Sequence, residues 1–146
     1  MEINVERIIG RPAGEVTPFF FEVVNNPVWQ SGMKSCEWLT DPPVRVGSTY
    51  RQEAEFRGKP VLSTFEVTEL TANRMRIESI ESTFPIQVTR IVEPIDDVSC
   101  RVSAHISGRP GGVMRILTFV GARIAKRSIE ADYDRLVSHF EDSDAG

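Results

Sequence analysis

Apolar and polar residues alternate along seven separate segments of the chain, which is the pattern of β-strands with one buried and one solvated face. The first segment lies near the start of the chain, and the other six follow one another in its middle. Short connections rich in Gly, Pro, Asn and Asp separate those six segments, which favours an antiparallel meander. The seven predicted strands cover residues 2–9, 34–39, 48–56, 61–70, 74–81, 85–93 and 100–107.

Two short helical segments are predicted between the first and second strands. Residues 15–24 carry apolar side chains at intervals of three and four residues, the spacing of a helix with one buried face. Asn25 and Pro27 end this helix, and residues 27–32 are predicted to form a second helical turn that holds Trp29.

One long helix, residues 112–141, is predicted to close the chain. Its second half has the single apolar stripe of a helix that lies on a sheet. Its first half, from Val113 to Ala125, is apolar on more than one side and therefore needs a second cover. Burial inside the domain, a cavity ligand, a helical lid or a second subunit would provide it. A homodimer and a membrane-surface face, with Arg115 and Arg123 on the polar side, both remain open.

The order of these elements predicts an α+β protein. A sheet accompanied by a single long helix has to wrap around that helix in order to bury it. Such a wrap leaves an internal cavity between sheet and helix. The sequence therefore predicts a protein that binds a small apolar molecule.

Length and charge narrow the function classes. A chain of 146 residues is long enough for one domain with its own core, predicted to span residues 1–146. The net charge of −4 gives no general attraction to nucleic acid. Neither a secretory signal nor an apolar run of the ~18–20 residues that cross a bilayer is recognisable. We therefore expect a cytoplasmic protein without a nucleic-acid partner or an integral membrane segment.

Cysteine and histidine give no sign of a metal centre. Cys36 and Cys100 lie far apart and are expected to be two buried thiols. His105 and His139 lack the spacing of metal ligands. No metal and no cofactor are expected.

Several short motifs resemble the START-like helix-grip superfamily, in particular its bacterial branch called SRPBCC or polyketide cyclase/dehydrase-like. The resemblance covers the chain from about Ile3 to Glu141, and it depends on the order and spacing of the motifs. They are Ile9-Gly10-Arg11-Pro12-Ala13 with Val16, Asn26-Pro27-Val28-Trp29, Val46-Gly47-Ser48-Thr49-Tyr50, Phe65-Glu66-Val67-Thr68-Glu69-Leu70, and the run from Asp134-Arg135-Leu136 to Phe140-Glu141.

The resemblance implies a helix-grip fold, in which a seven-stranded antiparallel sheet grips the C-terminal helix and two short helices lie between strands one and two. It also implies a ligand cavity between sheet and helix. Members bind lipids, sterols, polyketides, aromatic metabolites or plant hormones, and some cyclise or dehydrate polyketides. Fold in this superfamily does not fix function.

A set of side chains on the inward faces of the predicted elements is expected to line the cavity. Arg90 is the most informative member, because it lies between Val88 and Val92 on a face that should be dry, and a buried guanidinium needs a partner. Two alternatives are a slip in strand parity that turns Ile91 inward, and an ion pair with a glutamate, Glu53 or Glu66. The predicted lining is Trp29, Trp38, Tyr50, Gln52, Phe65, Met75, Ile77, Ser79, Val88, Arg90, Leu117 and Val120.

Several of these residues could instead have a purely structural role. Tyr50, Trp29 and Trp38 also suit plain core packing. No serine has a histidine at a spacing that suggests a nucleophile and its base. The sequence therefore favours non-catalytic binding of a hydrophobic or aromatic molecule such as a lipid, a polyketide or a similar metabolite. The alternative is a polyketide cyclase or dehydratase that uses the same cavity.

Overall fold

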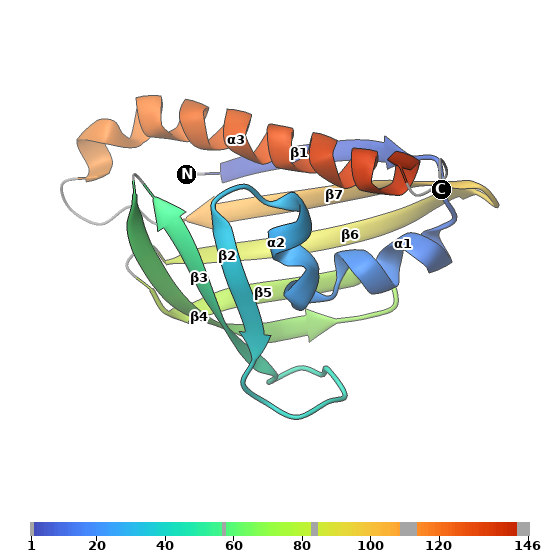
Figure 1. Cartoon of the computed structure of the whole chain (residues 1–146), viewed down its shortest axis with the longest axis horizontal. Coiled ribbons are helices and arrows are strands. Elements are labelled where there is room, and N and C mark those ends of the chain that lie inside the picture. Colours follow the sequence, from blue (N-terminus) through green and yellow to red (C-terminus); the bar gives the residue numbers. More distant parts are fainter. Residues whose placement is uncertain (1, 57, 83–84, 109–113, 143–146) are drawn as a thin grey trace.

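In the described part of the chain, seven antiparallel strands form one curved sheet in this computed structural model (Figure 1). The structure describes residues 2–56, 58–82, 85–108 and 114–142, although not the side chains of residues 56 and 114–122. The sheet order is β1-β7-β6-β5-β4-β3-β2, so that six strands form a meander and β1 joins it beside β7. The strands are β1 (Glu2–Ile9), β2 (Met33–Trp38), β3 (Thr49–Phe56), β4 (Lys59–Leu70), β5 (Arg74–Glu81), β6 (Ile86–Asp96) and β7 (Ser99–Gly108).

One long helix, α3 (Met114–Asp142), runs along the sheet beside β1 and β7 (Figure 1). Two short helices, α1 (Ala13–Phe20) and α2 (Asn26–Trp29), lie between β1 and β2 in the chain. In space α1 contacts β6 and β7, whereas α2 contacts β2 and α3. The α+β helix-grip architecture predicted from the sequence is therefore confirmed.

The first short helix ends earlier than its apolar spacing predicts. The helix α1 stops at Phe20, and a 3-10 turn, η1 (Val23–Asn25), follows where the sequence predicted continued α-helix to residue 24. Side chains from elsewhere satisfy the last carbonyls of α1. The Asn25 amide donates to the Phe19 oxygen at 3.2 Å, and Arg90 donates to the Phe20 oxygen at 2.7 Å. The Arg90 bond supplies a partner that a longer helix would provide from its backbone, whereas the Phe19 oxygen also accepts the Glu22 N–H at 3.3 Å.

Two hydrophobic clusters form the core. The larger one packs the second half of α3 against β1, β6, β7 and α1, and it confirms the apolar stripe predicted there. The smaller one is formed by side chains of η1 and of the strands β2 to β5. The larger cluster consists of Val5, Ile9, Val16, Phe20, Trp29, Val92, Cys100, Val102, Ala104, Tyr133, Leu136 and Phe140. The smaller cluster consists of Val23, Cys36, Tyr50, Phe65, Val67, Met75 and Ile77.

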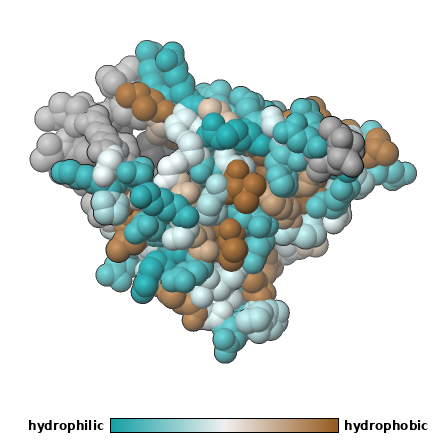
Figure 2. Space-filling view, viewed as in Figure 1, coloured by the Kyte–Doolittle hydropathy of each residue, from teal (hydrophilic) through white to brown (hydrophobic). Residues whose placement is uncertain are grey.

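The outer surface is mixed in character. The face in Figure 2 is mainly hydrophilic, with small separate apolar patches outside the grey residues, one of them over α2. Val28 on that helix is 58% exposed. The apolar segment from Val113 to Ala125, for which a second cover was predicted, lies largely outside the residues whose side chains are described. Among the described residues, no helix is both long enough and apolar enough to cross a membrane.

Candidate functional site

A cavity of about 190 Å³ lies where the two hydrophobic clusters meet, between the inner face of the sheet and α3. Its wall is mostly apolar, but several polar side chains interrupt it. The sheet contributes Tyr50, Gln52, Phe65, Ile77, Ile86, Val88, Arg90 and Ile106; α2 and the connection to β2 contribute Asn26, Gln30, Ser31 and Met33; α3 contributes Ile129, Asp132 and Tyr133.

Arg90 points inward from the middle of the sheet. It lies between Met75 on β5 and Ala104 on β7, both of which are buried. Its neighbour Ile91 pairs instead with the next residues of those strands, so the alternative in which Ile91 takes the inward place is wrong. Only 3% of Arg90 is exposed.

The surroundings of Arg90 compensate its charge without a carboxylate. Its Nη1 donates to the Phe20 backbone oxygen at 2.7 Å, at the C-terminal end of α1. Its guanidinium carbon lies 5.0 Å from the ring centre of Phe20 and 5.2 Å from that of Trp29, which is cation–π distance. Among the described residues, no carboxylate lies within ion-pairing distance of Arg90. The predicted alternatives of a pair with Glu53 or Glu66 are therefore not found.

Three buried polar atoms on residues of the cavity wall lack a hydrogen-bond partner. They are the Tyr50 hydroxyl, Asn26 Oδ1 and Arg90 Nε. Tyr50 is 0% exposed and Asn26 is 2% exposed, so water outside the protein does not reach them. Most buried polar groups in folded proteins have a partner, and leaving one unpaired costs about 1–3 kcal/mol. All three belong to residues of one cavity wall, and each is buried so completely that a molecule in the cavity reaches it only after a neighbouring side chain moves.

Burial keeps the phenols of this site protonated. Desolvation raises the pKa of Tyr133 to about 12, although the nearby Arg90 guanidinium counteracts it. Desolvation also raises the pKa of Tyr50, again against the charge of Arg90. Both residues are therefore neutral near pH 7. Neither serves as a base at that pH, but the Tyr50 hydroxyl is free to donate or accept a hydrogen bond.

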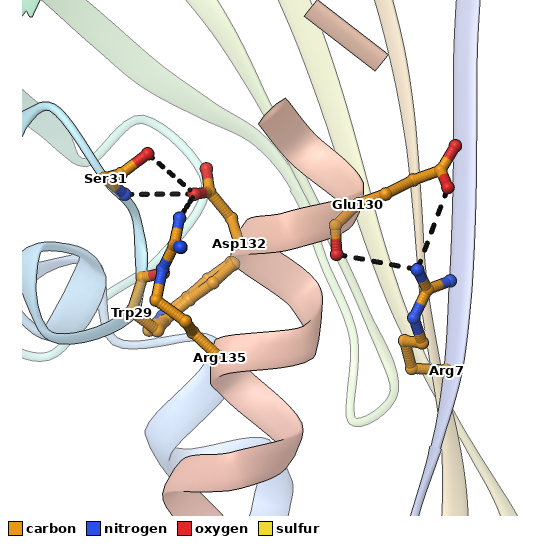
Figure 3. A network of polar contacts seen from close by, with 6 residues as sticks. All are labelled: Arg7, Trp29, Ser31, Glu130, Asp132 and Arg135. Atoms are coloured by element: carbon orange, nitrogen blue, oxygen red, sulfur yellow. Dashed lines mark hydrogen bonds and ion pairs between the residues drawn. The ribbon is translucent and has the colours of Figure 1, made fainter. Parts of the chain in front are cut away.

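Asp132 joins α3 to the connection between α2 and β2, as Figure 3 shows. Its Oδ1 accepts the Ser31 backbone N–H at 3.0 Å and the Ser31 hydroxyl at 3.1 Å. The same oxygen accepts a hydrogen bond from the guanidinium of Arg135, whose Nε donates to the Trp29 backbone oxygen at 3.1 Å. We call these four residues the latch. Because Ser31 and Asp132 also line the cavity, the latch forms part of its wall.

A glycine directly after the latch is required by the backbone. Gly32 has φ of +78°, and a Cβ there would lie 3.2 Å from the backbone oxygen of Glu55. Most residues with a side chain avoid this left-handed conformation. Gly32 therefore allows the chain to turn from the latch directly into β2.

Comparison with known proteins identifies similar folds among solved structures. No family model and no curated protein matches the sequence. The protein TTHA0849 from Thermus thermophilus has a TM-score of 0.81 at 18% identity, over 98% of this chain and 99% of that one. A START superfamily protein from Mycobacterium smegmatis has 0.79 at 14%, over 97% of both chains. The Zhui aromatase/cyclase from Streptomyces sp. R1128 has 0.80 at 12%, over 97% and 93%.

The chain has the START-like helix-grip fold. This confirms the resemblance seen in the sequence at the level of the fold. Identities below 20% carry no information about substrate, so the activity of the Streptomyces protein is not transferred by this comparison.

Half of the predicted lining residues meet at the helix-grip cavity. Arg90 and Gln52 supply polar groups there, and the rest of this half is aromatic or aliphatic. The residues on the wall are Tyr50, Gln52, Phe65, Ile77, Val88 and Arg90. A role for any of them in binding a ligand remains a prediction.

The other predicted residues lie elsewhere. Trp29 packs against Arg90 and Tyr133 behind the wall. Trp38 packs on the edge of Tyr50 and donates to the Glu22 carboxylate, and the Ser79 hydroxyl accepts the Ile86 N–H. Met75 lines a separate open groove of about 310 Å³ beside α1. Leu117 and Val120 lie outside the residues whose side chains are described.

Asp132 and Asn26 are two of the nine wall residues that sequence reasoning missed. In the sequence, Asn26 was noted within the motif Asn26-Pro27-Val28-Trp29, and Asp132 was given no role. A signal for Asp132 was present, because it lies three residues after Ile129 and four before Leu136 and thus shares their apolar face. A carboxylate on such a stripe is expected to have a specific partner. No comparable signal marks Asn26, whose position depends on the turn between η1 and α2.

Proposed function

We propose that the helix-grip cavity binds a small, mainly apolar molecule through an acidic or electron-rich group that meets Arg90. The buried guanidinium without a carboxylate partner is the observation that carries the proposal. A cation removed from water costs several kcal/mol unless it is paired. A carboxylate, phenolate or enolate on a ligand would supply the missing partner, and the Tyr50 hydroxyl would donate a further hydrogen bond.

The volume of the cavity favours a ligand of about one substituted aromatic ring. An apolar cavity of about 150 Å³ is known to hold benzene, and this one measures about 190 Å³. A lipid chain or a long polyketide needs more room than that. Within the predicted range of lipids, polyketides and similar metabolites, the proposal therefore selects small aromatic metabolites. Its expected setting is the cytoplasm, where the free thiols of Cys36 and Cys100 are stable.

A second candidate is catalysis of polyketide cyclisation or dehydration in the same cavity. It is favoured by the presence of Arg90 and Asp132 on one wall. Asp132 would accept a proton from the carbon between two carbonyl groups, and Arg90 would stabilise the enolate that forms. We rank this candidate second because the cavity offers little space for a long poly-β-keto chain.

Calorimetric titration with benzoate and with neutral toluene tests the proposal. Benzoate is expected to bind the wild-type protein and to bind Arg90→Met at least about tenfold more weakly, because a charge-assisted hydrogen bond is worth about 1.5–3 kcal/mol. Toluene should bind both proteins alike. Arg90→Met is expected to fold, since replacing a buried charge by an apolar side chain of similar length often leaves stability unchanged or higher.

Arg76→Met is the matched control. Arg76 lies on β5 and pairs with Glu69 outside the cavity, so this substitution should leave benzoate binding unchanged. Equal binding of benzoate to the wild type and Arg90→Met, or no binding at all, contradicts the proposal. If the wild type turns over a poly-β-keto substrate, and Arg90→Ala binds it without turnover, the protein is an enzyme of the second kind.

A further inference from the structure

We infer that Asp132 forms a second recognition point in the cavity, so that the preferred ligand is a small aromatic acid that also carries a hydroxyl group. This inference rests on the proposed function, in which Arg90 holds the acidic group. It goes further because it assigns a role to a carboxylate at a different point of the wall.

Asp132 is the one acidic residue among the described residues of the cavity wall. It is only 8% exposed, and the three hydrogen bonds that it accepts all reach Oδ1. In Figure 3 the other carboxylate oxygen, Oδ2, has no contact with the residues drawn. An ionised carboxylate has acceptor sites on both oxygens, and a poorly solvated acceptor gains from a donor. A hydroxyl group on the ligand is such a donor.

Arg90 is not the hydrogen-bond or ion-pair partner of Asp132. No ion pair joins them, although both act on the same neighbour, Tyr133. The charge of Arg90 lowers the pKa of Tyr133, whereas the charge of Asp132 raises it. The cavity wall therefore carries a cation and an anion that do not pair with each other. A ligand with an acidic group alone matches only the cation.

Asn26 adds a second acceptor to the same wall. Its Oδ1 is buried and has no hydrogen-bond partner, while its Nδ2 lies 3.8 Å from the sulfur of Cys36. The wall residues thus carry two unpaired donors, Arg90 Nε and the Tyr50 hydroxyl, and acceptors at Asn26 and Asp132. The rest of the wall is mostly apolar, and the volume of about 190 Å³ suits one ring. A hydroxylated aromatic acid matches this set of groups better than an unsubstituted one.

The competing interpretation is that Asp132 only holds the latch. Its bonds to Ser31 and Arg135 would then be its entire role, and a hydroxyl group on the ligand would gain nothing. The two interpretations differ in a measurable way. A latch affects all ligands alike, whereas a recognition point affects only ligands that carry the donor.

The test is calorimetric titration of benzoate and the 2-, 3- and 4-hydroxybenzoates into the wild type, Asp132→Asn and Ser31→Ala. In the wild type, at least one isomer should bind about tenfold or more tightly than benzoate, as expected for a hydrogen bond to a charged group. In Asp132→Asn that advantage should fall to about twofold or less, because an amide NH2 can replace Oδ2. Ser31→Ala removes one of the three hydrogen bonds to Asp132 Oδ1 and keeps the carboxylate, so the affinities for benzoate and for the hydroxybenzoates should change by the same factor.

Each failure has its own signature. If benzoate binds through Arg90 but no isomer exceeds it by more than about twofold, the second recognition point is wrong and the proposed function stands. If Asp132→Asn lowers the affinities for benzoate and for the best isomer by the same factor, Asp132 is only part of the latch. If neither benzoate nor any isomer binds the wild type, the proposed function itself fails. The comparison of ligands on the wild type needs no variant, so misfolding of Asp132→Asn would not prevent a decision.

Discussion

Arg90 is a charged side chain held almost entirely out of water. The fold compensates it with a carbonyl at the end of α1 and with two aromatic rings. The negative end of a helix dipole and the face of an aromatic ring both favour a cation, but each contributes about 0.5–2 kcal/mol. They do not replace the counter-ion that a buried guanidinium usually has. Nε is a buried donor of Arg90 without a partner, and a hydrogen bond to a ligand would stabilise it most.

The inward direction of Arg90 was predictable from the sequence, but its partners were not. Strict alternation along β6 places Arg90 on the same face as Val92, and the structure agrees. Its contact with the Phe20 carbonyl depends on where α1 ends, and local sequence does not fix that point. Asp132 was missed for a related reason, since its partner Ser31 lies 101 residues away in the chain.

Buried acids should make the protein lose stability at alkaline pH. Burial raises the pKa of Cys36 from 9.0 to about 11 and that of Tyr133 from 10.0 to about 12. The unfolded chain releases these protons first, so above about pH 9 the folded state binds more protons and the free energy of unfolding falls as pH rises. The stability is fully present below about pH 9 and is lost progressively up to about pH 12, with Tyr133 accounting for roughly 2–3 kcal/mol.

Urea unfolding at several pH values checks this expectation. Tyr133→Phe should flatten the fall above about pH 10, because phenylalanine has no proton to release. Cys36→Ala should flatten the fall of the free energy of unfolding at the lower end of this pH range, which begins near pH 9. A free energy of unfolding that stays constant between about pH 8 and pH 11 in the wild type would contradict this account of the two groups.

At the scale of elements, α3 is held on both of its sides. Arg7 of β1 donates to the Asp134 carboxylate at 2.8 Å and lies 3.9 Å from that of Glu130. The latch holds the opposite side, and Figure 3 shows contacts of both sets. On the side toward the cavity, α3 is thus connected to the short segment before β2.

Breaking the latch should free that segment. Asp132→Ala removes the two hydrogen bonds that hold Ser31 in this segment, together with the one from Arg135, and each is worth about 0.5–3 kcal/mol. Hydrogen exchange of the backbone amides in residues 30–33 is expected to become about tenfold faster or more. Asp134→Ala is the matched control, since it removes an aspartate of α3 outside the latch and should leave these amides unchanged. Unchanged exchange in Asp132→Ala would show that the latch does not hold the segment.

The elements themselves were largely predictable. Period-two alternation set each strand to within a few residues, because one face of this sheet is buried and the other is wet. The helix predicted at residues 15–24 was the least accurate element. Its apolar spacing continues through Phe21 and Val23, but capping by Asn25 and Arg90 ends it at Phe20. Tertiary contacts overrode a local pattern there.

At the scale of the whole molecule, the curvature of the sheet creates the cavity. Register shifts between β2 and β3, between β4 and β5 and between β6 and β7 add twist. The sheet can therefore curl around α3 and separate the two core clusters. The existence of a cavity followed from the order of elements in the sequence. The volume of the cavity could not be predicted in this way, because it depends on these register shifts and on how the short helices pack between the sheet and α3.

A molecule of about one ring is expected to occupy this cavity and to contact Arg90. The most direct test is the 1H–15N NMR signal of Arg90 Nε, assigned through its loss in Arg90→Met, during titration with benzoate. A saturable shift is expected in the wild type. Val88→Phe, which places a larger side chain on the cavity wall, should abolish it. A signal that does not move at saturating benzoate, or that moves equally in Val88→Phe, would contradict the account.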